Sequence, residues 1–310
     1  MAITGTGTEQ DPFIVHSYDE IVEAVTSHYG TGATPYYSRL ANDINCNDYG
    51  VDWEWETIEL ASNAYGRTHA DILDLNGHTI KNAYIANNGY LFRGVNTTYP
   101  AEIKNGKTLN IFGNSPNGIF SSIKVTNISA SMEFGHINNN AISTCIVHNC
   151  ALYAIILDMN SHAFIYFGSA TDIKNVDIYL EAYGCDDSAT CMALRPSANS
   201  ATCDSVLLVG KAVPASNPPK DFKICTAKMY NSVIDFDMSA FVYPEGTTGT
   251  ANIISGNGDN TTVINKSNIN VSGYPRYAIP TGYLQATSTE EMKIGADLRS
   301  LGFLVVNVEE

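Results

Sequence analysis

Short apolar segments separated by asparagine or glycine recur along residues 72–180. Ile72–Leu75 is followed by Asn76-Gly77, and similar segments lie at Leu109–Phe112 and Phe164–Phe167. Segments of this length are too short for ordinary helices, and their β-branched and aromatic residues favour strands. The repetition predicts a parallel β-solenoid with roughly 20–29 residues per coil and about eight to ten coils in the central part of the chain.

Asparagine occupies the positions at which the predicted strands bend. Its side chain tolerates left-handed backbone angles and can bond to a neighbouring turn. In stacked coils the same side chains can form ladders, with each amide bonding to the coil above. We therefore expect bends and ladders at Asn76, Asn105, Asn127, Asn149 and Asn175.

Both ends of the chain carry signals for a covering helix. Ser17 and Glu20 form a capping box, which predicts a helix at about 17–28 over the first coil. Ser288 and Glu291 form a second one, so 286–310 is interpreted as a helix–strand cap or an oligomerisation segment. The predicted fold is all-β: a single-stranded right-handed parallel β-helix over 1–285, with short helical caps at both termini.

Several segments resemble right-handed β-helix proteins of the pectin-lyase-like superfamily. They are the Gly-Thr opening with Asp-Pro-Phe-Ile-Val (5–15), the start of the predicted helix (17–21) and Leu-Asp-Leu-Asn-Gly-His-Thr-Ile (73–80). The closing segment 291–303 is similar to the tail of β-helix proteins found in bacteriophage virions. Enzymes and inert spikes share this fold, so the resemblance speaks to fold more than to activity.

The resemblance implies a non-enzymatic virion structural protein: a tail spike, a fibre, or a capsid or tail decoration. Its expected partners are other virion proteins, two further copies of itself in a homotrimer, and glycans of the host cell surface. The N-terminus shows no signal peptide, and no run of 18 apolar residues occurs. We therefore expect synthesis in a host cytoplasm, localisation in the virion and no membrane insertion.

Charge and cysteine usage exclude further classes. The formal net charge is −15 and the pI is near 4.7, which argues against nucleic-acid binding. The seven cysteines form no C-x-x-C pair and several lie in apolar segments, so reduced core thiols are expected. The seven histidines show no metal-ligand spacing. No metal and no cofactor are expected.

Two alternatives to the structural role remain open. The first is a polysaccharide depolymerase, either a hydrolase with the carboxylate pair Asp186 and Asp187 or a lyase with Arg195. Polygalacturonases of this fold carry further motifs that this chain lacks, and its similar histidine, His136, lies upstream of the pair. The second alternative is a free glycan-binding module that uses some of the 18 tyrosines.

Overall fold

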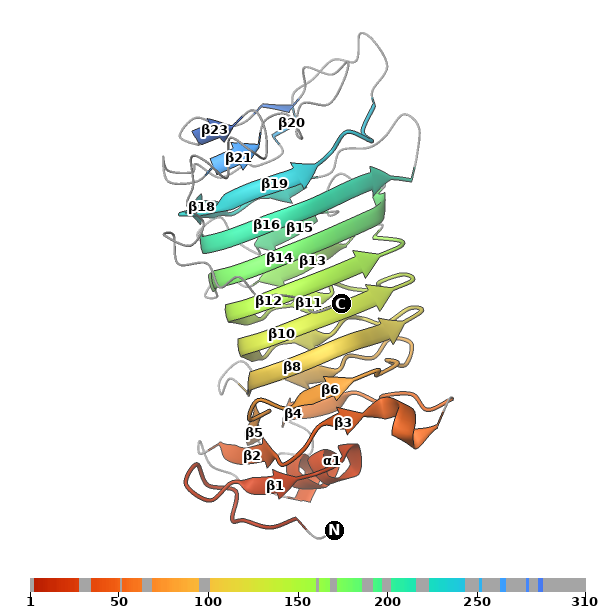
Figure 1. The fold of residues 1–310 in the computed structure, drawn as a ribbon, viewed down its shortest axis with the longest axis vertical. Coiled ribbons are helices and arrows are strands. Elements are labelled where there is room, and N and C mark those ends of the chain that lie inside the picture. Colours follow the sequence, from red (N-terminus) through yellow and green to blue (C-terminus); the bar gives the residue numbers. More distant parts are fainter. Residues whose placement is uncertain are drawn as a thin grey trace.

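The protein is a right-handed parallel β-solenoid, seen side-on in the computed structural model in Figure 1. The structure describes residues 3–27, 35–50, 52–62, 69–94, 101–159, 162–167, 172–185, 192–196, 202–215 and 223–242, together with four short strands between 251 and 286. The chain winds repeatedly through two sheets of parallel strands that enclose one hydrophobic core. The predicted fold class is confirmed.

The first sheet, here called the long sheet, forms the continuous ladder of Figure 1. Its parallel pairs link β1 to β2, β5, β8, β10, β12, β14, β16, β19, β21 and β23 in that order. Its strands are β1 (Phe13–Val15), β2 (Tyr36–Leu40), β3 (Ile44–Asn45), β5 (His69–Asp74), β6 (Thr79–Lys81), β8 (Glu102–Gly113), β10 (Lys124–Phe134), β12 (Ile146–Ile156), β14 (Asp172–Cys185), β16 (Thr202–Pro214), β18 (Lys228–Tyr230), β19 (Val233–Asp237), β21 (Val263–Asn265) and β23 (Leu284–Ala286).

The second sheet, here called the short sheet, closes the coil on the other side. Its strands are β4 (Ile58–Ser62), β7 (Phe92–Gly94), β9 (Phe120–Ser121), β11 (Ile142–Ser143), β13 (Ala163–Phe167), β15 (Met192–Pro196) and β17 (Lys223–Cys225). These strands also pair in parallel, each with the equivalent strand of the next coil. β20 (Ala251–Asn252) and β22 (Tyr277–Ala278) form a separate parallel pair.

The predicted asparagine bends are confirmed at all five positions. Their φ angles lie between 53° and 59°, in the left-handed region that asparagine tolerates. The amide of Asn127 donates to Oδ1 of Asn105 at 3.0 Å, and the amide of Asn175 donates to Oδ1 of Asn149 at 3.0 Å. The ladder lets each long strand turn a corner while its bend stays bonded to the neighbouring coil.

The number of coils differs from the prediction. Equivalent residues are 22 apart from Glu102 to Lys124 and 30 apart from Ile72 to Glu102. Between residues 71 and 183 the ladder passes only through β5, β8, β10, β12 and β14, which makes four coils. The expectation of eight to ten was wrong, because each coil uses 22 to 30 residues to pass through both sheets, and residues 71–183 are long enough for only about four such coils.

The helix α1 (Tyr18–Ser27) covers the first coil, as the capping box predicted. The backbone N–H of Glu20 donates to Oγ of Ser17 at 3.2 Å. The reciprocal bond is shifted by one residue, because Oε2 of Glu20 accepts from the backbone N–H of His16 at 2.8 Å. Ile21 and Val25 bury the inner face of the helix against the core. The predicted C-terminal cap, 286–310, lies outside the described residues apart from the end of β23.

The glycine-rich opening fits the same end tightly. Gly5 and Gly7 have φ angles of 97° and 75°. A Cβ on Gly5 would collide with the carbonyl oxygen of Pro12, and one on Gly7 would collide with the ring of Phe13. Glycine alone combines a relaxed positive φ with the absence of a Cβ, so both positions require glycine.

Reduced core thiols were predicted for the seven cysteines, and the structure confirms this for six of them. Cys46, Cys145, Cys150, Cys185, Cys203 and Cys225 are all free and buried. Burial raises the pKa of Cys46, Cys145 and Cys150 to about 12, so these thiols stay protonated at neutral pH. Cys191 lies outside the described residues.

Candidate functional site

Equivalent turns of successive coils bring an imidazole and a carboxylate together. Phe134 and Ile156 are register partners that end β10 and β12, and His136 and Asp158 each follow two residues later. Nδ1 of His136 lies 3.0 Å from Oδ2 of Asp158. Gly184 takes the same place in the next coil, at φ 68°, where a Cβ would come within 2.9 Å of Oδ1 of Asp158. The glycine leaves room for the carboxylate.

A second histidine lies beside this pair. The rings of His136 and His162 meet edge to face with centroids 6.5 Å apart. Burial lowers the pKa of His162, and the neighbouring His136 and Arg195 lower it further. At neutral pH His162 is therefore a neutral imidazole, which can accept a proton or a hydrogen bond.

Arg195, predicted as a possible lyase residue, reaches the same place from the short sheet. It is the register partner of Tyr166, and its Cζ lies 5.5 Å from the centre of that ring. Its charge also acts on His162, so Arg195 lies in the neighbourhood of the two histidines and Asp158. The group His136, Asp158, His162, Tyr166 and Arg195 is here called the histidine cluster. It combines a neutral base with a fixed cation, which suits an anionic ligand.

The predicted pair Asp186 and Asp187 lies outside the described residues, in the connection from β14 to β15. The sequence analysis did not identify the other members of the histidine cluster as a site, and it considered the histidines mainly for metal-ligand spacing. A signal for His136 and Asp158 is present in the sequence. Each lies two residues after the last inward-facing residue of a long strand, so the two occupy equivalent positions in successive coils.

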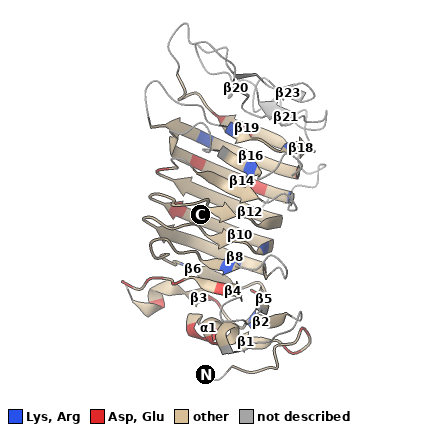
Figure 2. Ribbon diagram, turned by 180° about the vertical axis from the view of Figure 1, so that it is seen from behind, with Lys and Arg blue, Asp and Glu red and all other residues tan. Residues whose placement is uncertain are grey.

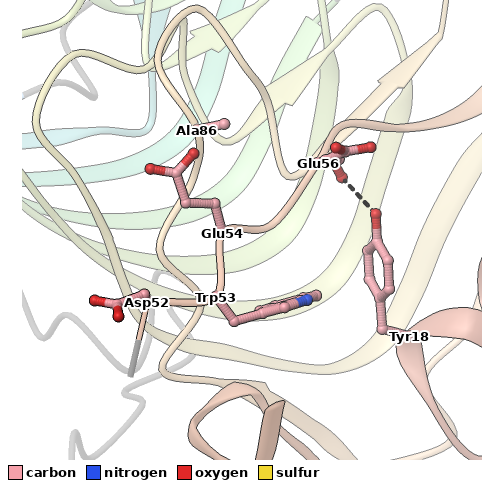
Figure 3. Close-up of a pocket in the computed structure, with 6 residues that line it drawn as sticks. All are labelled: Tyr18, Asp52, Trp53, Glu54, Glu56 and Ala86. Atoms are coloured by element: carbon pink, nitrogen blue, oxygen red, sulfur yellow. Dashed lines mark hydrogen bonds between the residues drawn. The ribbon is translucent and has the colours of Figure 1, made fainter. Parts of the chain in front are cut away.

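A separate pocket of about 400 Å³ opens beside α1. Figure 3 shows the indole of Trp53 extending toward the ring of Tyr18. The two rings meet edge to face with centroids 4.9 Å apart, and Tyr49 stacks on Trp53 at 4.6 Å. The residues that line the pocket are Tyr18, Asp52, Trp53, Glu54, Glu56 and Ala86.

Tyr18 anchors one wall of this pocket. Its backbone N–H donates to the hydroxyl of Tyr49 at 2.8 Å, and its own hydroxyl donates to the carbonyl oxygen of Glu56 at 3.3 Å. Burial, followed by the charge of Glu56, raises the pKa of Tyr18 to about 12. The phenol thus remains a neutral donor at any physiological pH.

A third polar group lies on the outer face of the long sheet. Glu181 accepts hydrogen bonds of 2.6 Å from the hydroxyls of Tyr179 and Tyr183, and Nζ of Lys211 lies 3.0 Å from its Oε2. The phenol donors, and after them Lys211, lower the pKa of Glu181 to about 2. Tyr153 stacks on Tyr179 at 4.9 Å. Each of these polar groups is satisfied internally, so we interpret this row as a stabilised surface.

Within the described ranges, no group of three or more His, Cys, Asp or Glu residues could hold a metal ion. None of the helical segments that the structure describes is both long and apolar enough to cross a lipid bilayer.

Comparisons with known proteins add little to this chemistry. No family model matches the chain, and no curated protein does. A crystal structure of a candidate immunoglobulin A1 protease from Bacteroides ovatus is similar, with 15% sequence identity and a TM-score of 0.49. The match covers 93% of this chain and 87% of that one. At this level of similarity its named activity carries no argument for this chain, which stands as a parallel β-solenoid protein.

Proposed function

We propose that the chain is a rigid, non-enzymatic β-helix of a bacteriophage virion, as a spike, a fibre or a capsid or tail decoration. The observation that carries the proposal is the ladder of parallel pairs from β1 to β19, enclosing one continuous core. Neighbouring coils share that core and the asparagine bonds, so the stack moves as one body. Such a body suits the display of a binding surface at a fixed distance.

The virion setting rests on the sequence resemblance at both ends of the chain. Solenoids can bury long faces against one another, which supports a homotrimer attached to other virion proteins. The half-buried tyrosines on the long sheet are side chains that can stack on sugar rings, which supports adhesion to cell-surface glycans.

Localisation tests this proposal most directly. An antibody against the chain is applied to gradient-purified particles from lysed cultures, with immunogold microscopy and peptide mass spectrometry as readouts. We expect gold on the particle surface and peptides of the chain in the particle fraction. Recovery in the soluble lysate alone would contradict the proposal. Sedimentation equilibrium of the pure protein tests the trimer, and a monomer would exclude it.

The histidine cluster favours a second candidate function, a depolymerase of acidic polysaccharides. The guanidinium of Arg195 can pair with a uronate carboxylate. The neutral imidazole of His162 can accept a proton from carbon next to that carboxylate, as an elimination requires. The contact between His136 and Asp158 would hold the imidazole of His136, the neighbour of His162, in place.

Turnover assays separate the two candidates. The protein is incubated with uronate-containing polymers, and ultraviolet absorbance of unsaturated products and new reducing ends are followed. A lyase should lose activity in Arg195→Lys and in His162→Gln. His78→Gln is the matched control, because His78 also lies beside a carboxylate, at 3.2 Å from Asp43, but far from the cluster. A hydrolase that uses the acidic pair should instead respond to Asp187→Asn. Under the leading proposal, none of these polymers is cleaved.

A further inference from the structure

The negative charge of the protein is concentrated at its N-terminal end. Residues 1–62 contain eleven Asp and Glu but a single Lys or Arg, Arg39, and so carry a net −10 of the total −15. Figure 2 shows acidic residues on α1 and along the loop beside β3. Field lines from such a one-sided surface attract cations and steer their approach.

The pocket beside α1 lies within this acidic end. Its three carboxylates and the indole of Trp53 come from one short segment, residues 52–56, and all of them line the same pocket. Asp52, Glu54 and Glu56 are all exposed, and Trp53 between them is half-buried. None of the three carboxylates forms an ion pair with a Lys or Arg that the structure describes. Their charge is therefore available to a ligand.

The aromatic side of the pocket is fixed before any ligand arrives. Tyr49 stacks on Trp53 with an interplanar angle of 24°, and the fully buried Trp55 lies behind it with ring centroids 6.0 Å apart. The indole N–H of Trp55 donates to the carbonyl oxygen of Leu91 at 2.9 Å. A ring held in this way presents its π surface at little further entropic cost.

We propose that this pocket binds a guanidinium or ammonium group presented by a basic segment of a partner protein. The cation lies against the indole of Trp53, and the carboxylates of Glu54 and Asp52, which line the same pocket, attract it. Arginine fits better than lysine, because its planar group stacks on an aromatic ring and forks toward carboxylates at the same time. The proposal depends on the acidic end alone and does not require a virion setting.

Intrinsic fluorescence provides the readout, since Trp53 and Trp55 are the two tryptophans of the chain. The full chain is titrated with hexa-arginine, with hexa-lysine and with a neutral linear hexasaccharide. We expect a saturable change with hexa-arginine, a weaker one with hexa-lysine and none with the sugar. Raising the salt concentration should weaken the peptide binding.

Surface variants separate the pocket from diffuse attraction. Asp52→Asn combined with Glu54→Gln should weaken hexa-arginine binding about fivefold or more. Glu23→Gln combined with Asp19→Asn removes the same charge from α1 outside the pocket, and should weaken binding less than about twofold. Both pairs are exposed, so the fold is retained.

Three results would overturn the proposal. One is equal weakening by the two variant pairs, which would mean that only net charge is sensed. Another is binding of the neutral sugar in place of the peptides, which would mark the pocket as a glycan site. The third is an unchanged affinity in Trp53→Leu, because the indole would then take no part.

Discussion

The regular coils and the N-terminal end of this protein are built on opposite principles. Along β10, most residues alternate between core and surface, with Val125, Ile128 and Phe134 inward. Its neighbour β12 pairs with it in register, and β8 pairs with it with one register shift between Ala130 and Met132. Residues 3–62 contain instead a helix, the 3-10 helix Cys46–Tyr49 and a cluster of four large aromatic rings. The regular coils thus form a rigid support, and the irregular N-terminal end carries a surface with distinct side-chain chemistry.

The two regions also differ in what limits their stability. Each central coil packs against one coil on either side, so both neighbours stabilise it against unfolding. The first coil has one neighbour, and its other face depends on α1 for cover. The N-terminal end should therefore open before the central coils do, and the following predictions test this contrast.

Removing the fully buried ring of the aromatic cluster should have the largest effect. Trp55 is fully buried, and Trp55→Ala should cost about 3–5 kcal/mol of unfolding free energy through lost contacts and a cavity. Urea denaturation measures the loss. Hydrogen exchange should show faster opening of β1 to β4 with β10 to β16 still protected.

Phe134→Ala is the matched change in the regular coils, since Phe134 is also fully buried. Its cost should be similar, but its faster exchange should centre on β10 and the coils on either side. If both variants lose protection uniformly along the chain, the two regions form one cooperative unit and the contrast is wrong.

The asparagine ladder should rank next. Asn127 has a φ of 54°, so Asn127→Ala incurs left-handed strain of about 1–2 kcal/mol and loses the bond to Asn105, worth about 1 kcal/mol. Asn127→Gly loses only the bond and should be the milder variant. Urea midpoints compare them, and a glycine variant as unstable as the alanine variant would refute the role of the bend.

Acid should weaken the long sheet through Glu181. Its pKa in the folded chain is lowered from 4.5 to about 2, so the stabilisation is complete above pH 4.5 and disappears as pH falls toward 2. We expect about 1 kcal/mol or less, because solvent screens the site. Glu181→Gln should flatten the stability curve over this window, measured by urea denaturation at several pH values, and an unchanged slope would contradict the assignment.

Asp177 on the same strand should show the opposite sign. Burial raises its pKa from 3.8 to about 6, so ionisation above pH 6 opposes folding and stability rises as pH falls from 6 toward 4. Asp177→Asn should therefore stabilise the protein slightly at pH 7. A destabilised variant would mean that the carboxylate is held by a favourable contact.

The smallest effect is expected from thiol reagents. In a Cys191→Ser background, the six remaining thiols are buried and should react with a soluble disulfide reagent only after denaturation. Rapid reaction of the native protein would show that the coils open far more often than this structure implies.

Much of the fold could be predicted from the sequence because its signals are local. Apolar segments, asparagine bends and the Ser17 capping box each act within a few residues, and the structure confirms all three. The coil count was too high, because a coil that passes through both sheets needs 22 to 30 residues and the regular segment is too short for eight of them. The pectin-lyase-like resemblance and the C-terminal cap stay predictions.

The candidate site was less accessible to sequence reasoning, and the reason is again physical. His136 and Asp158 are 22 residues apart and meet only because one coil separates them. Coil length varies from 22 residues to 30 or more, so such neighbours cannot be paired without the register. The lyase role predicted for Arg195 stays a prediction, and the sequence could not name its neighbours because they lie in turns whose stacking was unknown.

Distances between spin labels along one outward row test the stacked register directly. Arg39, Lys174 and Tyr230 lie in the same row, five and seven coils apart by successive register partners. Labels are placed on cysteines introduced at these positions in the Cys191→Ser background. With about 4.8 Å per coil, electron–electron double resonance should give narrow distributions near 24 Å for Arg39 with Lys174 and near 34 Å for Arg39 with Tyr230. Broad distributions, or distances that do not grow with the number of coils, would contradict a rigid parallel β-helix.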